Sequence, residues 1–321
     1  MNLYLGIDLG SVSTNLVALD ENRELCYSLY LRTQGQPIPT VQKGLALLTK
    51  ELGTGIKVRG VGTTGSGRQL AGVMIGADSV KNEITAHAVA ASHLEPNVQT
   101  VLEIGGQDSK IIILRNGVVA DFAMNTVCAA GTGSFLDQQA SRLNLPIEEF
   151  GPRSLEAKTP VRIAGRCSVF AESDMIHKQQ MGHNLADILA GLCEALVRNY
   201  LNNVGKGKEI LSPVVFQGGV AANVGIKAAF EKALGLKVMI PKHYNVMGAL
   251  GAAILAQEAV AKGKPTAFKG LGTAEENYQA GSFECKGCPN LCEVIEINCN
   301  ARTVARWGDR CGKWNQQAAI G

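Results

Sequence analysis

The sequence has no long apolar run, little net charge and few prolines, and each of these features excludes a class of protein. No apolar run reaches the ~18 residues that a membrane helix needs, and residues 1–8 contain neither the basic nor the apolar region of a secretory signal. The 31 Lys and Arg residues nearly balance the 28 Asp and Glu, so the net charge of +3 provides no strong field for nucleic acid or an anionic membrane. With 46% hydrophobic residues and 10 prolines, the composition is neither disordered nor collagen-like. We therefore expect a cytoplasmic globular protein with no nucleic-acid or membrane partner.

Two common nucleotide-binding signatures are also missing. Residues 62–69 have the glycine spacing of a P-loop, but Arg68 and Gln69 stand where Lys followed by Ser or Thr is required. No G-x-G-x-x-G sequence opens a helix after a strand with an acidic residue ~20 positions later. The sequence therefore supports neither a Walker-type nor a Rossmann fold.

Glycine, in contrast, is abundant, with 37 of 321 residues, and many glycines lie where the backbone turns tightly or approaches a ligand. Residues 3–9 and 14–19 are apolar and flank a small polar turn, which predicts a β-hairpin. The pattern recurs at 101–114, where residues 109–114 align with residues 14–19. A period this long, seen twice, indicates two related domains rather than a solenoid. A third strand with a glycine pair is expected at 214–219.

Helical patterns alternate with these strands, which predicts a mixed α/β protein. We expect helices at 40–52, 79–94, 133–143, 168–180, 185–204, 220–234 and 248–262. The expected organisation is a first subdomain at 1–95, a second at 96–262 whose final helix (about 246–262) packs back on the first, a linker at 263–282 and a cysteine-rich tail at 283–321.

Each hairpin carries a carboxylate at or beside its turn. Asp8 precedes Gly10, and Asp108 follows the pair Gly105 and Gly106. Free backbone N–H groups at such turns suit phosphate oxygens, and carboxylates suit Mg²⁺, which binds through water and substrate phosphates. A facing pair of turns is therefore predicted to bind a nucleoside triphosphate and Mg²⁺.

These motifs resemble those of a known superfamily. Residues 5–11, 103–108 and 217–221 are similar to the two phosphate motifs and the adenosine motif of the superfamily that unites sugar kinases, actin and heat-shock chaperones. Within it, residues 125–135 and 166–174 resemble the ATP-driven activators (reductase components) of 2-hydroxyacyl-CoA dehydratases and the related benzoyl-CoA reductase ATPase subunits. The resemblance implies two duplicated ribonuclease H-like domains with the nucleotide in the cleft.

The resemblance also implies roles for single residues. Asp8 and Asp108 would hold Mg²⁺ through water, and Gln107 or Asp108 would orient the attacking water. Serine and threonine hydroxyls would contact the phosphates, and the glycine pair 218–219 would let adenosine approach the backbone. The expected set that binds ATP or ADP comprises Gly10, Ser11, Ser13, Thr14, Gly105, Gly106, Ser109, Gly131, Thr132, Gly133, Gly218, Gly219, Val220 and Ala221.

Two of the nine cysteines fall inside the activator-like motifs. Cys128 and Cys167 are each followed by a helical pattern, and a helix N-terminus favours thiolate and an anionic cluster. A 4Fe-4S cluster needs four thiolates, and a two-fold dimer supplies the second pair. The resembling family shares one such cluster between two subunits at these positions. Cys26 and Cys193 are expected to be packed apolar residues.

The activity that the resemblance implies is an anaerobic, homodimeric ATPase that couples hydrolysis to one-electron transfer. The acceptor would be a 2-hydroxyacyl-CoA dehydratase, a benzoyl-CoA reductase-like protein or a related iron-sulfur enzyme, and ferredoxin or flavodoxin would supply the electron. Two alternatives remain open: a sugar or small-molecule kinase of the same superfamily, and a nucleotide-gated redox sensor.

The C-terminal tail carries five further cysteines. Their density predicts a four-thiolate metal site, and the spacing leaves both zinc and iron-sulfur open. Cys299 lies in strand-like sequence and is predicted to be no ligand. The predicted ligands are Cys285, Cys288, Cys292 and Cys311.

Overall fold

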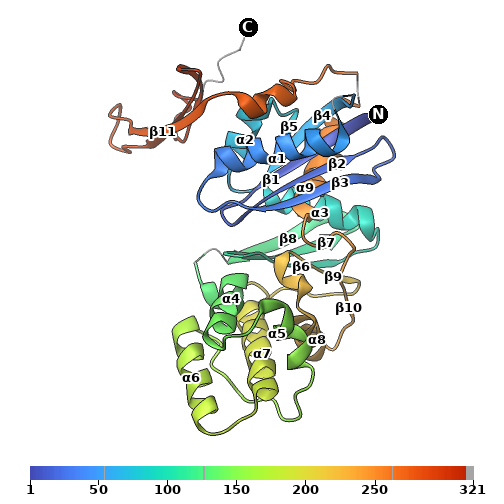
Figure 1. Cartoon of the computed structure of the whole chain (residues 1–321), viewed down its shortest axis with the longest axis vertical. Coiled ribbons are helices and arrows are strands. Elements are labelled where there is room, and N and C mark those ends of the chain that lie inside the picture. The colour runs from blue at the N-terminus through green and yellow to red at the C-terminus, as the bar shows by residue number, and fades with distance from the viewer. Residues whose placement is uncertain (54, 126, 262, 316–321) are drawn as a thin grey trace. The chain divides into compact units, whose positions relative to one another are not determined.

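The computed structural model describes residues 1–53, 55–125, 127–261 and 263–315 (Figure 1). The chain divides into two compact units, which we call unit 1 (Met1–Ala86 and Gly248–Gly321) and unit 2 (His87–Met247). The domain boundaries drawn from the sequence stay predictions.

Unit 1 is built on a five-stranded sheet of order β3-β2-β1-β4-β5. The first three strands form an antiparallel meander, while β4 and β5 run parallel to β1. The strands are β1 (Asn2–Leu9), β2 (Ser13–Leu19), β3 (Leu25–Arg32), β4 (Lys57–Thr64) and β5 (Ser79–Val80). The helices are α1 (Pro37–Leu52) and α2 (Arg68–Ile75), together with α3 (Glu83–Leu94) and α9 (Met247–Val260), each of which contains a boundary between the units.

Unit 2 repeats this plan with a sheet of order β10-β9-β6-β7-β8. Strands β6, β7 and β8 are again antiparallel, while β9 and β10 run parallel to β6, so the duplication predicted from the hairpins is confirmed in the sheet topology. The strands are β6 (Thr100–Ile104), β7 (Ser109–Arg115), β8 (Val118–Asn125), β9 (Val214–Gln217) and β10 (Val238–Met239). The helices are α4 (Gly133–Arg142), α5 (Ile147–Ser154), α6 (Ser168–Gln180), α7 (Leu185–Asn203) and α8 (Val224–Leu234), with short 3₁₀ turns η1 (Ala129–Gly131) and η2 (Gly219–Ala222).

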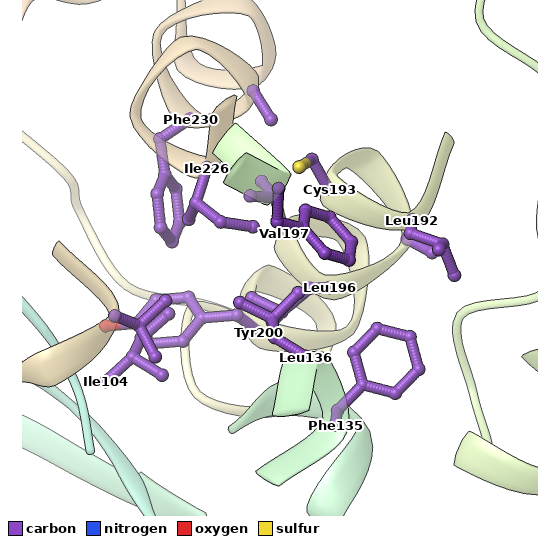
Figure 2. Packing of buried hydrophobic residues seen from close by; sticks show 14 of the residues in the cluster. Ile104, Phe135, Leu136, Leu192, Cys193, Leu196, Val197, Tyr200, Ile226 and Phe230 are labelled. Atoms are coloured by element: carbon purple, nitrogen blue, oxygen red, sulfur yellow. The ribbon is translucent and has the colours of Figure 1, made fainter. Parts of the chain in front are cut away.

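A single apolar cluster fills the core of unit 2 (Figure 2). Side chains from β6, α4, α7 and α8 converge there, among them Ile104, Phe135 and Tyr200. Tyr200 meets Phe230 edge-on with ring centroids 5.2 Å apart. Its hydroxyl donates to the carbonyl of Lys110 at 2.6 Å, and burial raises its pKa well above the usual value. This hydrogen bond fixes the backbone of β7 directly beside the second hairpin turn.

Glycines in unit 1 let α9 lie directly on the sheet. Gly6 of β1 and Gly62 of β4 are register partners and share one face. A Cβ at Gly6 would lie 1.8 Å from the carbonyl O of Ala249, and one at Gly62 would lie 2.0 Å from that of Ala252. Part of the glycine excess therefore serves close packing between helix and strand, not ligand binding.

We expect Gly6→Ala to lower the free energy of unfolding by about 1–3 kcal/mol, because the added methyl must displace the backbone of α9. The matched control is Gly281→Ala, whose Cβ would meet nothing within 4 Å and which should be neutral or slightly stabilising. Urea unfolding of both variants measures the difference. Equal stability of the two variants would contradict the close contact between β1 and α9.

The C-terminal segment is part of unit 1. It contains the 3₁₀ turn η3 (Leu271–Glu275) and an antiparallel sheet of β11 (Tyr278–Glu284), β12 (Glu293–Cys299) and β13 (Arg302–Trp307). Tyr278, Ile297 and Val304 belong to the same buried cluster as Leu70 and Met74. The tail thus shares the core of unit 1.

Candidate active site and cysteine site

The first hairpin turn is closed by a hydrogen bond from Gly10 N–H to the carbonyl O of Ser13 (2.9 Å). Thr33 donates its hydroxyl proton to the carbonyl O of Gly10 (2.9 Å). Thr14 Oγ1 lies 2.9 Å from Thr33 Oγ1, and because the Thr33 proton is already used, the Thr14 hydroxyl donates to Thr33. Thr14 is fully buried, whereas Ser11 is exposed and Ser13 is partly exposed. Of the hydroxyls predicted to contact phosphate in this turn, Ser11 and Ser13 are the accessible ones.

Asp8 lies at the end of β1 between two polar neighbours. Its register partners are Asn15 on β2 and Thr64 on β4, so the three side chains share a face of the sheet. Asn15 Oδ1 and Thr64 Oγ1 are buried and have no hydrogen-bond partner within the described ranges. The carboxylate of Asp8 lies against two glycines, since a Cβ at Gly65 or Gly248 would come within 2.6 or 2.1 Å of it. Uncommitted polar atoms beside a carboxylate fit a hydrated divalent cation.

The segment rejected as a P-loop forms part of this site. Gly67 N–H donates to the carbonyl O of Leu9 (2.8 Å), and Gly65 adopts a φ of 92°. This turn brings the end of β4 to the end of β1. Neither Thr64 nor Gly65 was predicted as a site residue, although the glycine-rich run 62–67 was a signal for them.

The second hairpin turn repeats the first. Gly105 N–H donates to the carbonyl O of Asp108 (3.0 Å). Gln107 at its tip is exposed, while Ser109 is fully buried and its Oγ has no partner in the part of the chain that the structure describes. The two turns therefore present the same backbone geometry, each with a carboxylate nearby.

A buried lysine, not predicted from the sequence, holds the carboxylate of the second turn. Lys110 is 2% exposed, and its Nζ lies 2.8 Å from Asp108 Oδ2 and 3.1 Å from Glu103 Oε2. Glu103 is also buried. It lies close to Gly218, because a Cβ at Gly218 would come within 2.8 Å of Glu103 Oε1. Lys110 and Glu103 thus connect the second turn to the glycine pair after β9.

The third glycine turn follows β9. Gly218 has a φ of 88°, and a Cβ there would lie 2.4 Å from the carbonyl O of Ile104, so only glycine fits. Gln217 donates its side-chain N–H to His87 Nδ1 (2.7 Å), which places the imidazole proton on Nε2. Val220 and Ala221, which were predicted to contact the nucleotide, are buried in η2.

The structure brings the segments of Cys128 and Cys167 together within unit 2. Cys128 directly precedes η1, Cys167 occupies the N-cap position of α6, and Cys128 Sγ lies 3.9 Å from the carbonyl O of Arg166. Asn125 clamps the first segment, because its side chain accepts from Cys128 N–H (3.0 Å) and donates to Cys128 O (2.9 Å). Both thiols are partly exposed.

Exposed apolar side chains lie close to both cysteines in the sequence. Val127 is 94% exposed beside Cys128, and Val169 and Phe170, just after Cys167, are 64% and 69% exposed. Large apolar side chains this exposed suit a protein–protein contact.

The tail cysteines are not gathered into a preformed site. Among the described residues, no group of three or more His, Cys, Asp or Glu side chains is arranged to hold a metal ion. Cys285 N–H donates to the carbonyl O of Cys292 (2.8 Å), while Cys288 and Cys311 are exposed. The Trp314 indole N–H, which donates to Cys285 Sγ at 3.2 Å, lowers the pKa of that thiol. The predicted metal site stays a prediction.

Cys299 differs from the other tail cysteines. Its thiol donates to Glu276 Oε2 at 3.4 Å, and burial, together with that carboxylate, raises its pKa. A thiol held in the protonated form is a poor metal ligand.

None of the described helices is both long and apolar enough to span a membrane.

Comparison with known proteins identifies a family and several relatives that are similar to this chain. Residues 5–256 match the BadF/BadG/BcrA/BcrD ATPase family. The (R)-2-hydroxyglutaryl-CoA dehydratase activating ATPase of Acidaminococcus fermentans is 34% identical over 82% of this chain and 100% of its own length. The activator of lactoyl-CoA dehydratase from Anaerotignum propionicum is 31% identical over 80% of this chain and 98% of its own.

Among solved structures, the activator of the 2-hydroxyisocaproyl-CoA dehydratase from Clostridium difficile with bound ADPNP superposes with a TM-score of 0.74. It is 31% identical and covers 81% of this chain and 97% of its own. The predicted mixed α/β fold with two sheets is thereby confirmed.

Proposed function

The chain belongs to the BadF/BadG/BcrA/BcrD ATPase family and is an ATP-hydrolysing enzyme, and from this premise we propose that it drives electron transfer to a partner iron-sulfur enzyme. The proposed form is a homodimer that shares one 4Fe-4S cluster, receives electrons from ferredoxin or flavodoxin and works in an anaerobic cytoplasm. The proposed acceptor is a 2-hydroxyacyl-CoA dehydratase or a related reductase, since the relatives include activators of such dehydratases.

Two carboxylates support the nucleotide half of the proposal. Asp8 and Asp108 would hold Mg²⁺ through water, and the N–H groups of the two hairpin turns would contact the phosphates of ATP. Gln107, exposed at the tip of its turn, would orient the attacking water. Phosphoryl transfer to water depends mainly on positioning and charge neutralisation, which these groups can supply.

The observation that carries the electron-transfer half is the meeting of the Cys128 and Cys167 segments. Two thiols per chain are half of what a 4Fe-4S cluster requires, and the exposed Val127, Val169 and Phe170 beside them suit a contact with a second copy. The N-terminus of α6, next to Cys167, favours an anionic cluster at this position. When bound, the cluster would supply one-electron chemistry.

For the tail, we propose that Cys285, Cys288, Cys292 and Cys311 assemble around zinc or an iron-sulfur centre upon binding. The lowered pKa of Cys285 supports a thiolate, which is the form that binds metal. The main-chain hydrogen bond between Cys285 and Cys292 already holds the two segments together.

Anaerobic purification with metal and sulfide analysis tests both cysteine sites. We expect about four iron and four sulfide per two chains for the shared cluster, plus the tail metal. Cys128→Ser should lose the cluster and ATP-dependent reduction of an acceptor, whereas Cys285→Ser should lose only the tail metal. Cys26 is exposed on β3, so the expectation that it is packed was wrong. Cys26→Ser is therefore the matched control and should change neither.

The alternatives give different results. An iron-free protein that phosphorylates a small molecule would be a kinase. A protein that holds the cluster but never passes an electron to an acceptor would be a redox sensor. Undiminished electron transfer in Cys128→Ser would overturn the assignment of the cluster ligand.

A further inference from the structure

The start of α4 is capped by the second hairpin turn. The carbonyl O of Gly105 accepts from Gly133 N–H (2.8 Å), and that of Gly106 accepts from Ser134 N–H (2.9 Å) and from the Ser134 hydroxyl (2.6 Å). The N-cap residue, Thr132, makes no side-chain hydrogen bond to the helix. Free N–H groups at a helix start are usually satisfied by a local cap, but here the turn proposed to bind phosphate satisfies them.

In this arrangement the N–H and the carbonyl of one peptide group face different partners, the proposed phosphate and α4. The carbonyl of Gly106 and the N–H of Gln107 belong to one planar unit, as do the carbonyl of Gly105 and the N–H of Gly106. If the N–H side of such a unit turns toward or away from a phosphate, its carbonyl side must turn as well. The hydrogen bonds to Gly133 and Ser134 then transfer that rotation to α4.

The start of α4 is closely connected to Cys128. Thr132 donates both its N–H (3.1 Å) and its hydroxyl (2.8 Å) to the carbonyl O of Ala129, the residue after Cys128. The short turn η1 between them is therefore fixed at both ends. A displacement of α4 at Gly133 would move Cys128 with it.

A second contact connects α4 to the helix that follows Cys167. Glu172 of α6 accepts from Gln138 Nε2 on one carboxylate oxygen (2.8 Å) and from Arg142 Nε on the other (2.7 Å). Glu172 lies little more than one turn beyond Cys167, and its side chain is 13% exposed. Through this contact α4 and α6 are held at one relative orientation within the subunit.

We propose that Ser134 is the positioning residue through which the phosphate turn sets the position of Cys128, and that Glu172 extends the displacement to Cys167. The inference rests on the proposed ATP site at Gly105 and Gly106. It assigns to two polar side chains of unit 2 the coupling between the nucleotide state and the cysteines.

The test measures alkylation of the two thiols in the full-length, iron-free protein. Iodoacetamide rates at Cys128 and Cys167 are determined by peptide mass spectrometry with ADP and with a non-hydrolysable ATP analogue, with the exposed Cys26 as internal reference. We expect the wild-type rates to differ between the nucleotides by about fivefold or more, as allosteric couplings commonly do. Ser134→Ala should reduce this difference at both cysteines, because it removes the hydroxyl bond to Gly106 and leaves the two main-chain bonds. Ser134→Thr, which keeps the hydroxyl, should restore the full difference.

Glu172→Gln provides a second, independent test in the same alkylation experiment. It should preserve the nucleotide effect at Cys128 and reduce it at Cys167, because only the connection between the two helices is weakened. The matched control is Ser173→Ala, which removes an exposed α6 serine whose hydroxyl donates to the carbonyl O of Val169 (3.1 Å) and should leave both effects intact.

Nucleotide titration separates the proposed ATP site from the proposed coupling through Ser134. If the wild type binds neither nucleotide, the proposed function is wrong. If it binds both, and either the wild-type rates are equal or Ser134→Ala retains the full difference, the coupling role of Ser134 is overturned while the ATP site stands. Should Ser134→Ala fail to fold, an unchanged nucleotide effect at Cys167 in Glu172→Gln would overturn the pathway.

Discussion

Replacing Lys110 with methionine is expected to lower the free energy of unfolding by about 3–5 kcal/mol and ATP hydrolysis by about 10²-fold. The stability loss follows because Lys110 is the buried cation between Glu103 and Asp108, and its removal takes a positive counter-charge away from the buried Glu103 carboxylate. The activity loss follows because Asp108 would no longer be held in place, and a displacement of about 1 Å costs that much. Chemical unfolding and steady-state ATPase assays measure the two effects.

Lys232→Met is the matched control for this prediction. Lys232 also pairs with a glutamate, Glu194, at 2.7 Å, but its side chain is 70% exposed, so its loss should cost no more than ~1 kcal/mol. The double variant Lys110→Met/Glu103→Gln should recover part of the lost stability, since the buried negative charge is reduced. Equal stability of Lys110→Met and Lys232→Met would show that the buried network contributes nothing.

The elements that the sequence predicted well are those whose signal is local. The hairpin of β1 and β2 was bounded by its own glycine turn, and α6 was predicted with the same bounds, 168–180, that the structure shows. The helix expected at 79–94 begins later, at Glu83, because Ser79 and Val80 pair with β4 as β5. A pairing between distant strands leaves no local pattern to read.

The same limit explains the site residues that were missed. Thr64 joins Asp8 only because β4 pairs in parallel with β1, a contact between segments more than 50 residues apart. Lys110 was missed for a different reason: lysine is rarely buried, and only its place between Glu103 and Asp108 shows its role. The glycine excess suggested ligand contacts, whereas the glycines at 6 and 62 are required by a helix from a distant part of the chain, α9.

Asp8→Asn is expected to lower Mg²⁺-dependent ATP hydrolysis by about 10³-fold while leaving the fold intact. Asparagine has nearly the same shape, so it fits between Gly65 and Gly248 without a new clash. It lacks the charge that would hold Mg²⁺. The metal supplies several kcal/mol of transition-state stabilisation, and each factor of ten in rate corresponds to about 1.4 kcal/mol. Initial rates measured over a range of Mg²⁺ concentrations test this expectation, because a weakened metal site should need more Mg²⁺ for half-maximal rate.

Asp20→Asn makes the same change elsewhere in unit 1. Asp20 accepts hydrogen bonds from the N–H groups of Asn22 and Glu24 at the turn between β2 and β3, and the amide oxygen of asparagine can replace this acceptor. ATP hydrolysis should therefore be unchanged in this control. If Asp8→Asn kept the wild-type rate and Mg²⁺ dependence as well, the carboxylate at the end of β1 would not be a metal-binding group, and the buried oxygens of Asn15 and Thr64 beside it would need another explanation.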